Sequence, residues 1–436
     1  MSQTPPLPSP SSNSTGRVLF ASLAGTTIEF FDFYIYATAA VLVFPQLFFP
    51  ATDPASAKLQ SLATFALAFF ARPVGSAVFG HFGDRIGRKA TLVAALLTMG
   101  LSTVIIGLLP TYASIGVLAP ILLALCRFGQ GFGLGGEWGG AVLLATENAP
   151  PGKRAWYGMF PQLGAPLGFL FSGGIFIVLS KSLTNAQFLD YGWRIPFIAS
   201  SLLVLVGLYV RLKITETPVF QKTIDKKERV DVPIMTVCRD HAAAVALGTV
   251  IALTTFVLFY LLVVFCLSWG TAKLGYTRDN FLMIQMIGVV FFALTIPVSA
   301  LLADRYGRRC VLLLVTAGIA AFGLILGPLF SAGELGVVLT MIFGFSLMGM
   351  TYGPLGTLLS ELFPTSVRYT GSSMSFNLGG IFGGSLAPYA ATWLATNHGL
   401  SAVGYYLVTA ALLTLLALWL SRETRDVDFA EKSPVL

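Results

Sequence analysis

Charged side chains are scarce in this chain. Lys, Arg, Asp and Glu together make up 11% of its 436 residues, against about 25% in a typical soluble domain. Hydrophobic residues make up 55%. This composition excludes a cytosolic enzyme, a nucleic-acid-binding protein and a disordered scaffold. Because a membrane-spanning helix takes about 20 apolar residues, the length suits roughly twelve spans joined by short loops.

Cysteine and histidine are also scarce. The four cysteines show no CxxC spacing and the three histidines are scattered, so we expect neither a disulfide framework nor a metal site. The sequence contains no phosphate-binding GxxxxGK[ST] loop, which disfavours ATP hydrolysis. It also contains no recognisable constellation of a nucleophile, a metal site or a cofactor site. The sequence therefore predicts a membrane protein that is not an enzyme and has no cofactor.

Apolar stretches bounded by charges or by Gly/Pro clusters predict two sets of six spans. The first set comprises 18–44, 58–82, 90–109, 115–146, 155–180 and 192–212. The second set comprises 241–270, 280–303, 310–330, 334–361, 370–396 and 400–421. Only one long stretch of the chain is dense in charge, and it separates the two sets.

This pattern divides the chain into five segments. They are a disordered cytoplasmic tail at 1–16, a first six-helix bundle at 17–212, a cytoplasmic linker at 213–240, a second six-helix bundle at 241–421 and a cytoplasmic tail at 422–436. The first tail is assigned as disordered because it is polar and rich in Pro and Ser.

The distribution of Lys and Arg predicts the orientation in the membrane. With both termini and the linker on the cytoplasmic side, 20 of the 27 Lys and Arg residues lie on that side. Cytoplasmic loops are enriched in basic residues, and the opposite orientation would invert the ratio. The same bias explains the formal net charge of +7 without a nucleic-acid partner.

The two halves of the chain repeat each other. The loop GDRIGRK (83–89) follows the second span, and ADRYGRR (303–309) follows the eighth. At the fourth and tenth spans a Glu is followed seven residues later by an Arg, as Glu147 and Arg154, and again as Glu361 and Arg368. Parallel repeats of this kind are a known transporter plan, with substrate bound at the midplane between the halves.

These motifs carry a resemblance to a known family. The two loops resemble the signature loop of the major facilitator superfamily, and RFGQGFG (127–133) resembles its fourth-helix motif. Three longer stretches resemble its metabolite:proton symporter branch: GTTIEFFDFYIYATAA (25–40), GLGGEWGGAVLLATENAPPGKR (133–154) and ELFPTSVRYTGSSMSFNLGG (361–380). Members of that branch carry shikimate, 2-oxoglutarate, citrate, or proline and betaines.

The resemblance covers the whole chain after the tail and implies both fold and activity. The implied fold is all-α, with twelve transmembrane helices in two pseudo-symmetric six-helix bundles. The implied activity is secondary active transport by alternating access in a bacterial inner membrane, as in similar metabolite transport proteins. We expect a monomer whose partners are a small-molecule substrate, protons and the lipid bilayer.

Five ionisable residues fall well within the predicted spans, all in the first half: Glu29, Asp32, Arg72, Arg127 and Glu137. Each costs roughly 2.5–3.5 kcal/mol near a helix centre, and such residues usually face the bundle interior and pair. Helical spacing places two sets of polar residues each on one face of a span, namely Glu29, Asp32 and Tyr36, and Arg127, Gln130 and Glu137. We therefore expect these stripes to converge on one polar cavity.

The charge count predicts a titratable group. Three acids face two arginines, and arginine keeps its proton, so one acid remains in a low-dielectric site where a carboxyl can load and release a proton. We expect Asp32 or Glu29 to have this role, with Glu137 a third candidate and Arg127 the partner that competes with the proton. The alternative is a fixed internal ion-pair network that only specifies geometry.

The arginines Arg72 and Arg127 favour a substrate that carries a carboxylate. The second half has no charge at mid-depth, so its contribution must be dipolar or aromatic. Candidate polar contacts in the first half are Gln130 and Tyr36. Those in the second half are Tyr260, Gln285, Tyr352 and Asn377, and for each of these four the alternative is a hydrogen bond between packed helices.

We therefore predict proton-coupled uptake of a small charged metabolite, with an organic acid as the leading substrate class. A zwitterion such as a betaine or proline is the second class, because nearby aromatic rings offer cation–π faces. Proton-coupled export is a further alternative, because Gly164–Gly168 partly resembles a Gly-Pro motif of drug antiporters.

The resemblance also implies a cytoplasmic gate. Asp84 with Arg88, and Asp304 with Arg308, would latch the cytoplasmic side, and Asp84 can face the positive N-terminal end of a helix in the opposite half. The same networks would include Glu147, Arg154, Glu361 and Arg368. For the basic members the alternative is that they reflect the membrane orientation alone.

Overall fold

The computed structural model describes residues 15–50, 54–213 and 233–427. Residues 1–14 of the tail predicted at 1–16, most of the predicted linker and the end of the second predicted tail lie outside the described residues. Thr15 and Gly16 of the first tail already belong to a helix. The first half contains α1 (Thr15–Leu42), α2 (Phe44–Leu47), α3 (Pro54–Arg85), α4 (Arg88–Leu108), α5 (Tyr112–Ile115), α6 (Leu118–Glu147), α7 (Arg154–Ser182), α8 (Asn185–Gln187), the π-helix η1 (Phe188–Gly192) and α9 (Arg194–Leu212). These ranges contain no strand, and the all-α prediction is confirmed.

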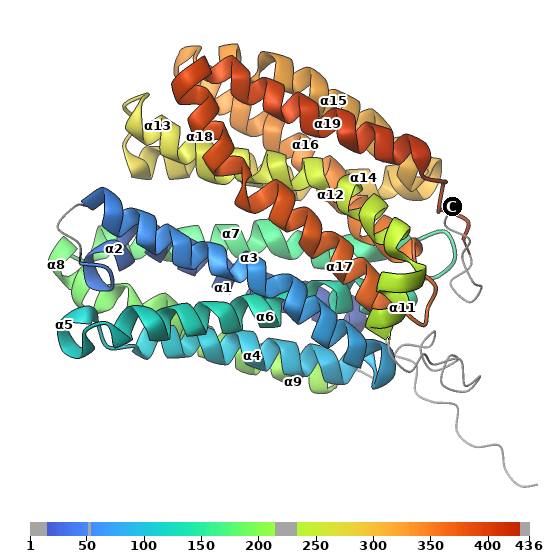
Figure 1. The fold of residues 1–436 in the computed structure, drawn as a ribbon, viewed down its shortest axis with the longest axis horizontal. Coiled ribbons are helices and arrows are strands. Elements are labelled where there is room, and N and C mark those ends of the chain that lie inside the picture. Colours follow the sequence, from blue (N-terminus) through green and yellow to red (C-terminus); the bar gives the residue numbers. More distant parts are fainter. Residues whose placement is uncertain (1–14, 51–53, 214–232, 428–436) are drawn as a thin grey trace, which may run out of the picture.

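The second half repeats this plan with two interruptions. It contains α11 (Pro233–Asp240), α12 (Ala242–Tyr260), the π-helix η2 (Leu261–Phe265), α13 (Cys266–Ala272), α14 (Arg278–Tyr306), α15 (Arg308–Phe330), α16 (Gly333–Glu361), α17 (Arg368–Gly380), the π-helix η3 (Ile381–Ser385), α18 (Ala387–His398) and α19 (Leu400–Leu420). In Figure 1 the helices α1–α9 form one layer and α12–α19 the other.

Eleven helices of the described residues are long and apolar enough to cross a membrane. The predicted span at 370–396 is a continuous path made of α17, η3 and α18, each too short to count alone. Gly383 and Gly384 fall within η3, and small residues let a π-bulge form without side-chain crowding. The break therefore accounts for the difference between eleven long helices and twelve spans.

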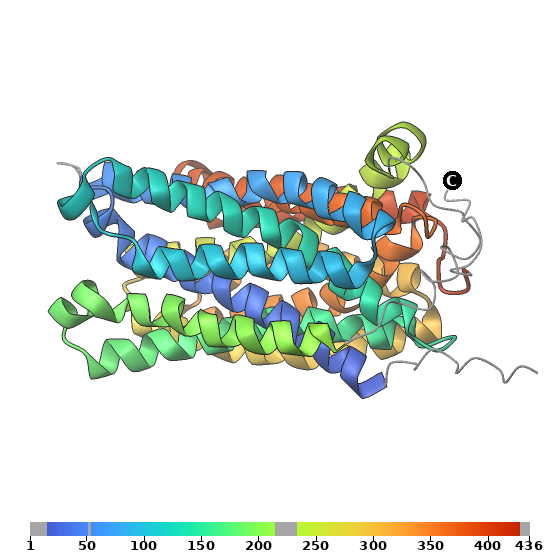
Figure 2. The same ribbon diagram turned by 90° about the horizontal axis from the view of Figure 1, so that it is seen from below.

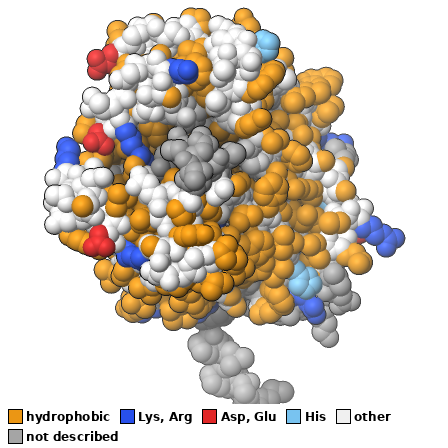
Figure 3. Space-filling view, turned by 60° about the vertical axis from the view of Figure 1, so that its left-hand side comes forward, with side chains coloured by type: hydrophobic (Ala, Val, Ile, Leu, Met, Phe, Trp, Pro, Cys, Tyr) orange, Lys and Arg blue, Asp and Glu red, His pale blue; other side chains and the backbone are white. Residues whose placement is uncertain are grey.

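The outer surface of the helices is apolar. Large hydrophobic side chains are exposed along most of the long helices, among them Leu125 on α6, Leu294 on α14 and Trp419 on α19. Figure 3 shows hydrophobic side chains spread over this surface. A soluble protein rarely exposes apolar area on this scale, so the chain is a multi-pass membrane protein.

The two halves meet along a small set of helices. α7 packs on α14, and α3 packs on α17. We call this contact surface between the two halves the seam, and each half supplies one helix to each side of it. The seam also includes contacts of α16 with α6 and α7. Figure 2 shows the long helices running the length of the molecule. The short helix α11, from the predicted linker, packs on α3 and α17 at one end.

Close helix packing within the first half positions one of the buried arginines. A Cβ on Gly135 of α6 would lie 2.1 Å from the carbonyl oxygen of Arg72 on α3, and a Cβ on Gly75 would lie 1.9 Å from the carbonyl oxygen of Phe132. Only glycine permits this backbone approach. The glycines therefore fix α3 against α6 at the depth of Arg72.

The predicted signature loops lie at the same end of the molecule, which is the right-hand end in Figure 1. They join α3 to α4 and α14 to α15, and in each loop a glycine precedes the second helix. Gly87 has a φ of 129° and Gly307 a φ of 100°, a region that L side chains rarely adopt. We call this end the Asp84 end.

Candidate functional site

A narrow cavity lies at the seam between the two halves. Its volume is about 30 Å³, enough for a few water molecules. The first half lines it with Glu29, Phe30, Phe33, Tyr34, Arg72, Leu134, Trp138 and Ala165, and the second half with Thr255, Phe256, Phe259, Tyr260, Phe292, Met348, Tyr352, Phe376 and Asn377. We call this space the central cavity.

Glu29 and Arg72 are the charged residues of this lining. Glu29 is 1% exposed and Arg72 is 4% exposed. Glu29 Oε2 and the Nε and Nη2 atoms of Arg72 have no hydrogen-bond partner. The described residues include no carboxylate within 4.0 Å of the Arg72 guanidinium, which instead lies over the rings of Phe33, at 4.7 Å, and Phe69, at 4.9 Å.

Arg127 lies next to the central cavity but does not line it. Its guanidinium is 4.9 Å from the centre of the Phe33 ring, which lines the cavity and which Arg72 contacts as well. Arg127 donates to Gln130 at 3.0 Å and lies 4.0 Å from the centre of the Tyr36 ring. Its Nε and Nη2 atoms have no hydrogen-bond partner.

Asp32 points toward α9 rather than into the central cavity. Its Oδ1 accepts a hydrogen bond of 2.5 Å from Ser200, and its Oδ2 has no partner. Gln130, on the Arg127 side, donates to Thr103 at 2.7 Å. The predicted polar stripes therefore meet in one region of the first half, where Asp32 and Arg127 are neighbours of the cavity and not part of its wall.

Glu137 has a partner that the sequence analysis did not include. Arg211, in the last turn of α9, forms a buried ion pair with Glu137 through both carboxylate oxygens. Arg211 also donates to the carbonyl oxygen of Leu92 at 2.7 Å. Gly25 makes room for the pair, because a Cβ there would lie 2.0 Å from Arg211 Nη2. Away from the Asp84 end, the described interior of the first half thus holds three acids and three arginines.

Arg211 was missed because it stands near the end of a span, where an arginine fits the membrane orientation equally well. Only the tilt of α9 against α4 and α1 directs it inward. This arginine removes the predicted surplus of one acid over the arginines. The pairing nevertheless leaves both Glu29 and Asp32 without an arginine within 4.0 Å among the described residues.

The polar residues predicted in the second half divide into two groups. Tyr260, Tyr352 and Asn377 line the central cavity. Gln285 does not, since its amide donates to the carbonyl oxygens of Leu262 and Val263 at 2.8 Å and 3.0 Å. Those carbonyls belong to η2, where the π-helix disrupts the regular bonding. Gln285 therefore matches the helix-packing alternative.

A chain of hydrogen bonds crosses the seam beside the cavity, and the sequence analysis missed its central residue. Trp138 donates to Gln162 Oε1 at 2.8 Å, and Gln162 donates to the carbonyl oxygen of Tyr352 at 2.8 Å. The Trp138 ring stacks on Phe376, with ring centres 3.5 Å apart and planes at 8°. A polar Gln in the middle of an apolar span was the signal that could have identified Gln162.

The seam is closed between the cavity and the Asp84 end. Asn377 donates to the carbonyl oxygen of Gly135 at 3.2 Å, and the Tyr369 hydroxyl donates to that of Gly136 at 2.5 Å. Both bonds run from α17 to α6. Together with the Trp138–Phe376 stack they hold the two halves together on this side of the cavity.

Asp84 binds the N-terminal end of α17, a helix of the opposite half. It accepts hydrogen bonds from the backbone of Tyr369 at 3.3 Å and of Thr370 at 3.0 Å, and from the Thr370 hydroxyl at 2.9 Å. Arg88 pairs with Asp84 at 3.0 Å. The positive end of a helix favours a carboxylate, as the sequence analysis expected for Asp84.

Asp304 makes the equivalent contact in the second half. It accepts hydrogen bonds of 2.9 Å from the backbone of Ala155 and of Trp156, at the start of α7. Arg308 pairs with it at 3.3 Å. The Asp304 side chain is 11% exposed, whereas the Asp84 side chain is fully buried. The two loops therefore cap helices reciprocally, with the Asp84 cap the better shielded.

The remaining predicted gate residues form two related ion-pair clusters. Glu147 lies 3.3 Å from Arg88 and 3.6 Å from Arg368. In the second half, Glu361 lies 3.3 Å from Arg308 and 3.6 Å from Arg154. All eight predicted gate residues thus gather at the Asp84 end, in two clusters related by the internal repeat.

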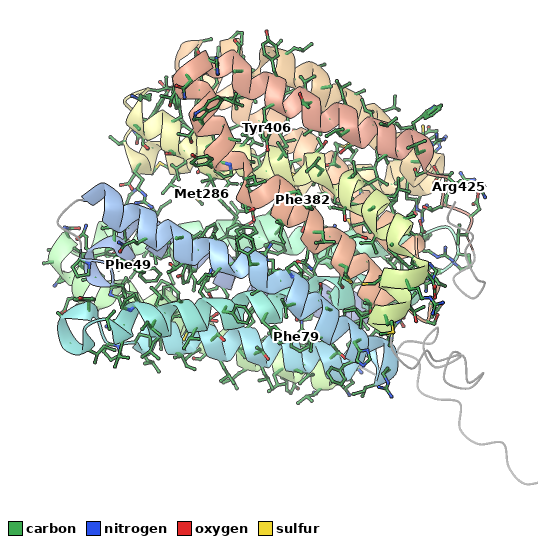
Figure 4. The ribbon with its side chains drawn as sticks, in the orientation of Figure 1. Phe49, Phe79, Met286, Phe382, Tyr406 and Arg425 are labelled. Carbon is green, nitrogen blue, oxygen red and sulfur yellow. The ribbon has the colours of Figure 1, made fainter. Side chains whose placement is uncertain are left out.

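The chain after α19 returns to the second cluster. Glu423 accepts from the backbone of Arg308 at 2.9 Å and of Arg309 at 3.0 Å, and Thr424 donates to Glu361 at 2.6 Å. Arg425 donates to the carbonyl oxygen of Arg305 at 3.0 Å and lies at the Asp84 end in Figure 4. The described part of the predicted C-terminal tail therefore packs against the second ion-pair cluster.

The whole chain is similar to known transport proteins. Residues 22–383 match the Major Facilitator Superfamily. The chain is 58% identical over 419 residues to the inner membrane metabolite transport protein YhjE of Escherichia coli (strain K12), covering 95% of each chain. It is 36% identical over 421 residues to the shikimate transporter of the same organism, covering 94% of this chain and 95% of the other. The fold alone is similar to that of the proton:xylose symporter XylE, with a TM-score of 0.75 and 18% identity over 93% of this chain and 95% of that one.

Proposed function

Because this chain belongs to the major facilitator superfamily, we propose that it couples inward proton movement to uptake of a small metabolite that carries a carboxylate. Membership of the family confirms the predicted fold of twelve spans in two bundles. The relatives are metabolite transporters, so the chain is a transporter of this kind and not an enzyme. Symport, the proton and the substrate class are the proposal.

One observation carries the proposal. The central cavity, at the seam between the halves, is bordered by a buried carboxyl and a buried guanidinium, Glu29 and Arg72, and both retain unpartnered polar atoms. Burying unsatisfied charge costs several kcal/mol. The cost is offset when a substrate carboxylate binds Arg72 and when a proton neutralises Glu29.

The proton site in this proposal is a carboxyl of α1. Glu29 borders the cavity itself, and Asp32 lies one turn away with one oxygen unpartnered. Glu137 is the weakest of the three candidates, because Arg211 neutralises it. Arg72 is the substrate contact, and Arg127, which contacts the Phe33 ring, supplies further positive potential.

Alternating access, in this proposal, depends on the two helix caps at the Asp84 end. With the caps of Asp84 and Asp304 in place, the Asp84 end is shut, and the cavity is too small for a metabolite. Uptake requires that the seam opens first at the opposite end and then at the Asp84 end, where the two clusters must separate. The eight gate residues therefore have the role of holding the closed state of that end.

Orientation and location complete the proposal. The Asp84 end carries the basic loops, so we place it in the cytoplasm together with both termini. We place the chain in a bacterial inner membrane, as the name of its relative YhjE states for that protein. We take the bundles as 17–212 and 241–421, joined by the linker 213–240, and the working unit as a monomer.

Uptake into membrane vesicles under an imposed inward proton gradient tests the proposal. A panel of organic acids and betaines identifies the substrate, and Glu29→Gln and Asp32→Asn identify the proton site. The matched control is Glu334→Gln, which removes an exposed carboxyl of α16. We expect at least one α1 variant to lose gradient-driven accumulation while it retains exchange at equal pH.

Two results would contradict the proposal. Full gradient-driven uptake in both α1 variants would exclude a proton site on α1. Efflux driven by the same gradient would identify an exporter. Each unit of pH difference supports about tenfold accumulation per coupled proton, so the expected signal is large.

A further inference from the structure

Aromatic rings dominate the wall of the central cavity. Ten of the lining residues are aromatic, and they come from both halves. The non-aromatic polar residues are Glu29, Arg72, Thr255 and Asn377. Tyr34, Tyr260 and Tyr352 add a hydroxyl each, while the faces of their rings are apolar. A site for a highly hydrophilic solute would present more hydrogen-bonding groups, so the wall favours a substrate with an apolar body.

Arg72 is arranged to bind one carboxylate. Its Nε and Nη2 atoms are unpartnered, and adjacent N–H groups of a guanidinium match the two oxygens of a carboxylate. Tyr260, from the second half, lines the same narrow cavity as Arg72. A carboxylate bound here would therefore contact both halves.

The wall offers no second cation. Arg127 contacts the Phe33 ring but is not part of the lining, and Arg211 is neutralised by Glu137. A second carboxylate on the substrate would face aromatic rings without a positive partner, at a large desolvation cost. A dicarboxylate or tricarboxylate is therefore disfavoured.

The charge balance of the first half determines the sign of the coupling. Away from the Asp84 end, the buried acids described in this half are Glu29, Asp32 and Glu137, the buried arginines are Arg72, Arg127 and Arg211, and together they sum to zero when all are ionised. One proton therefore leaves a charge of +1, which one monoanion neutralises. A zwitterion behaves in the opposite way, because its ammonium group would bind best beside ionised Glu29, and the proton would then compete with it.

Several groups besides Arg72 face Glu29 from neighbouring helices. Tyr34 on α1 and Tyr352 on α16 line the cavity with Glu29, whereas Arg211, paired with Glu137, and Tyr369 on α17 act on Glu29 through their electrostatic fields. The tyrosines stay protonated at neutral pH, and the ion pair stays charged. Among these groups, Glu29 is the one free to change charge in the working pH range.

We propose that the substrate is a monocarboxylate with a flat apolar body, which binds Arg72 through its carboxylate while Glu29 is protonated. The assignment rests on the proton symport proposed above and narrows its substrate class. The flat body lies between aromatic rings of the two halves, in the layer where Trp138 now stacks on Phe376. The cavity widens to admit it when the seam opens.

Titration calorimetry on the purified full chain, at several pH values, measures ligand binding and tests this assignment. The probes share one ring and differ in charge: benzoate, terephthalate and 4-(trimethylammonio)benzoate. We expect benzoate to bind best, and its affinity to rise as the pH falls, up to about tenfold per pH unit for one coupled proton. Acetate, which lacks the ring, should bind at least tenfold more weakly.

Variants separate the two contacts. Glu29→Gln should bind benzoate tightly without pH dependence, whereas Asp32→Asn should keep the wild-type dependence. Arg72→Gln should abolish benzoate binding, and Arg72→Lys should not restore it, because an ammonium lacks the planar fork. Arg305→Gln, which removes an exposed arginine at the Asp84 end, is the matched control and should bind as wild type.

Four results would overturn the assignment: no benzoate binding, tighter binding of terephthalate or of the zwitterion, affinity that rises with pH, or a wild-type pH dependence in Glu29→Gln. The proposed function fails separately. If benzoate binds with the expected pH dependence but no proton gradient drives its uptake, symport is wrong and the substrate class stands. If a gradient drives uptake of the zwitterion alone, symport stands and this assignment is wrong.

Discussion

The contact of Asp84 with α17 offers the sharpest test of the gate. Asp84→Asn keeps the size of the side chain but removes its charge. In the structure this carboxylate accepts three hydrogen bonds from Tyr369 and Thr370 and pairs with Arg88. The amide cannot accept at both positions, so one of its N–H groups would face a donor.

The cost can be worked from these contacts. A charge at a helix N-terminus contributes about 0.3–1 kcal/mol, and up to about 2 kcal/mol when partly buried. Each hydrogen bond to a charged group contributes about 1 kcal/mol more than a neutral one. The 3.3 Å bond from Tyr369 is long and is left out, so the helix end and the two bonds from Thr370 are counted. Their sum for Asp84→Asn is on the order of 2–4 kcal/mol, which raises the open-to-closed ratio at this end by about 30-fold to about 800-fold.

Alkylation of a cysteine placed in the seam measures that ratio. Ser373 on α17 is fully buried beside α6, and its hydroxyl has no partner, so Ser373→Cys removes no hydrogen bond. The native Cys126, Cys238 and Cys310, which are partly or fully exposed, are first replaced by Ser. We expect Asp84→Asn to raise the alkylation rate by at least about 30-fold, the lower bound above.

Asp304→Asn is the matched control within the same chain. Asp304 accepts two hydrogen bonds from the opposite half, whereas Asp84 accepts three, and the Asp304 side chain is partly exposed. Asp304→Asn should therefore raise the alkylation rate less than Asp84→Asn does. An unchanged rate in Asp84→Asn, or a larger effect of Asp304→Asn, would refute the reasoning.

Three further predictions concern the buried charges. Glu137→Gln should lower the melting temperature in detergent, because an unpaired buried arginine costs about 3–5 kcal/mol. Adding Arg211→Leu should recover most of the lost melting temperature, and a failure to recover it would contradict the pairing of Glu137 with Arg211. Gly25→Ala should lower the melting temperature too, because its Cβ would lie 2.0 Å from Arg211 Nη2, whereas Gly16→Ala, with nothing within 4 Å, should not; equal effects would exclude the steric cause. Initial uptake rates should rise as the external pH falls, because the protonated carrier accepts the carboxylate, and Glu29→Gln should flatten that profile; an unaltered profile would move the proton site elsewhere.

The gate was largely predictable, and the reason is local. Asp84 and Arg88, and Asp304 and Arg308, are four residues apart across a tight turn, so each pair meets regardless of what surrounds it. The sequence repeat then made one loop a guide to the other. The partners from the opposite half, Thr370 and Trp156, required the packed structure.

The sequence predicted a cavity with buried charges, but it did not predict which residues line it. Spacing along α1 placed Glu29 and Asp32 on one face, yet the structure turns Glu29 to the seam and Asp32 to Ser200. The tilt of each helix and its contacts decide between two positions one turn apart. Residue spacing within a single helix carries no information about the tilt of that helix or about its contacts with other helices.

The amino-acid sequence alone determined that this chain spans a membrane many times, in two related halves with paired charges at one end. The lengths of the hydrophobic stretches, the positions of the charges and the internal repeat are properties of the chain itself. In a bilayer an apolar stretch of sufficient length must form a helix, because its backbone polar groups find no water there. Only the tertiary structure decided which buried charges stay unpaired. Arg211 reaches Glu137 from a helix 74 residues away, and such a contact depends on how helices pack, so it leaves Glu29 and Arg72 to face the cavity.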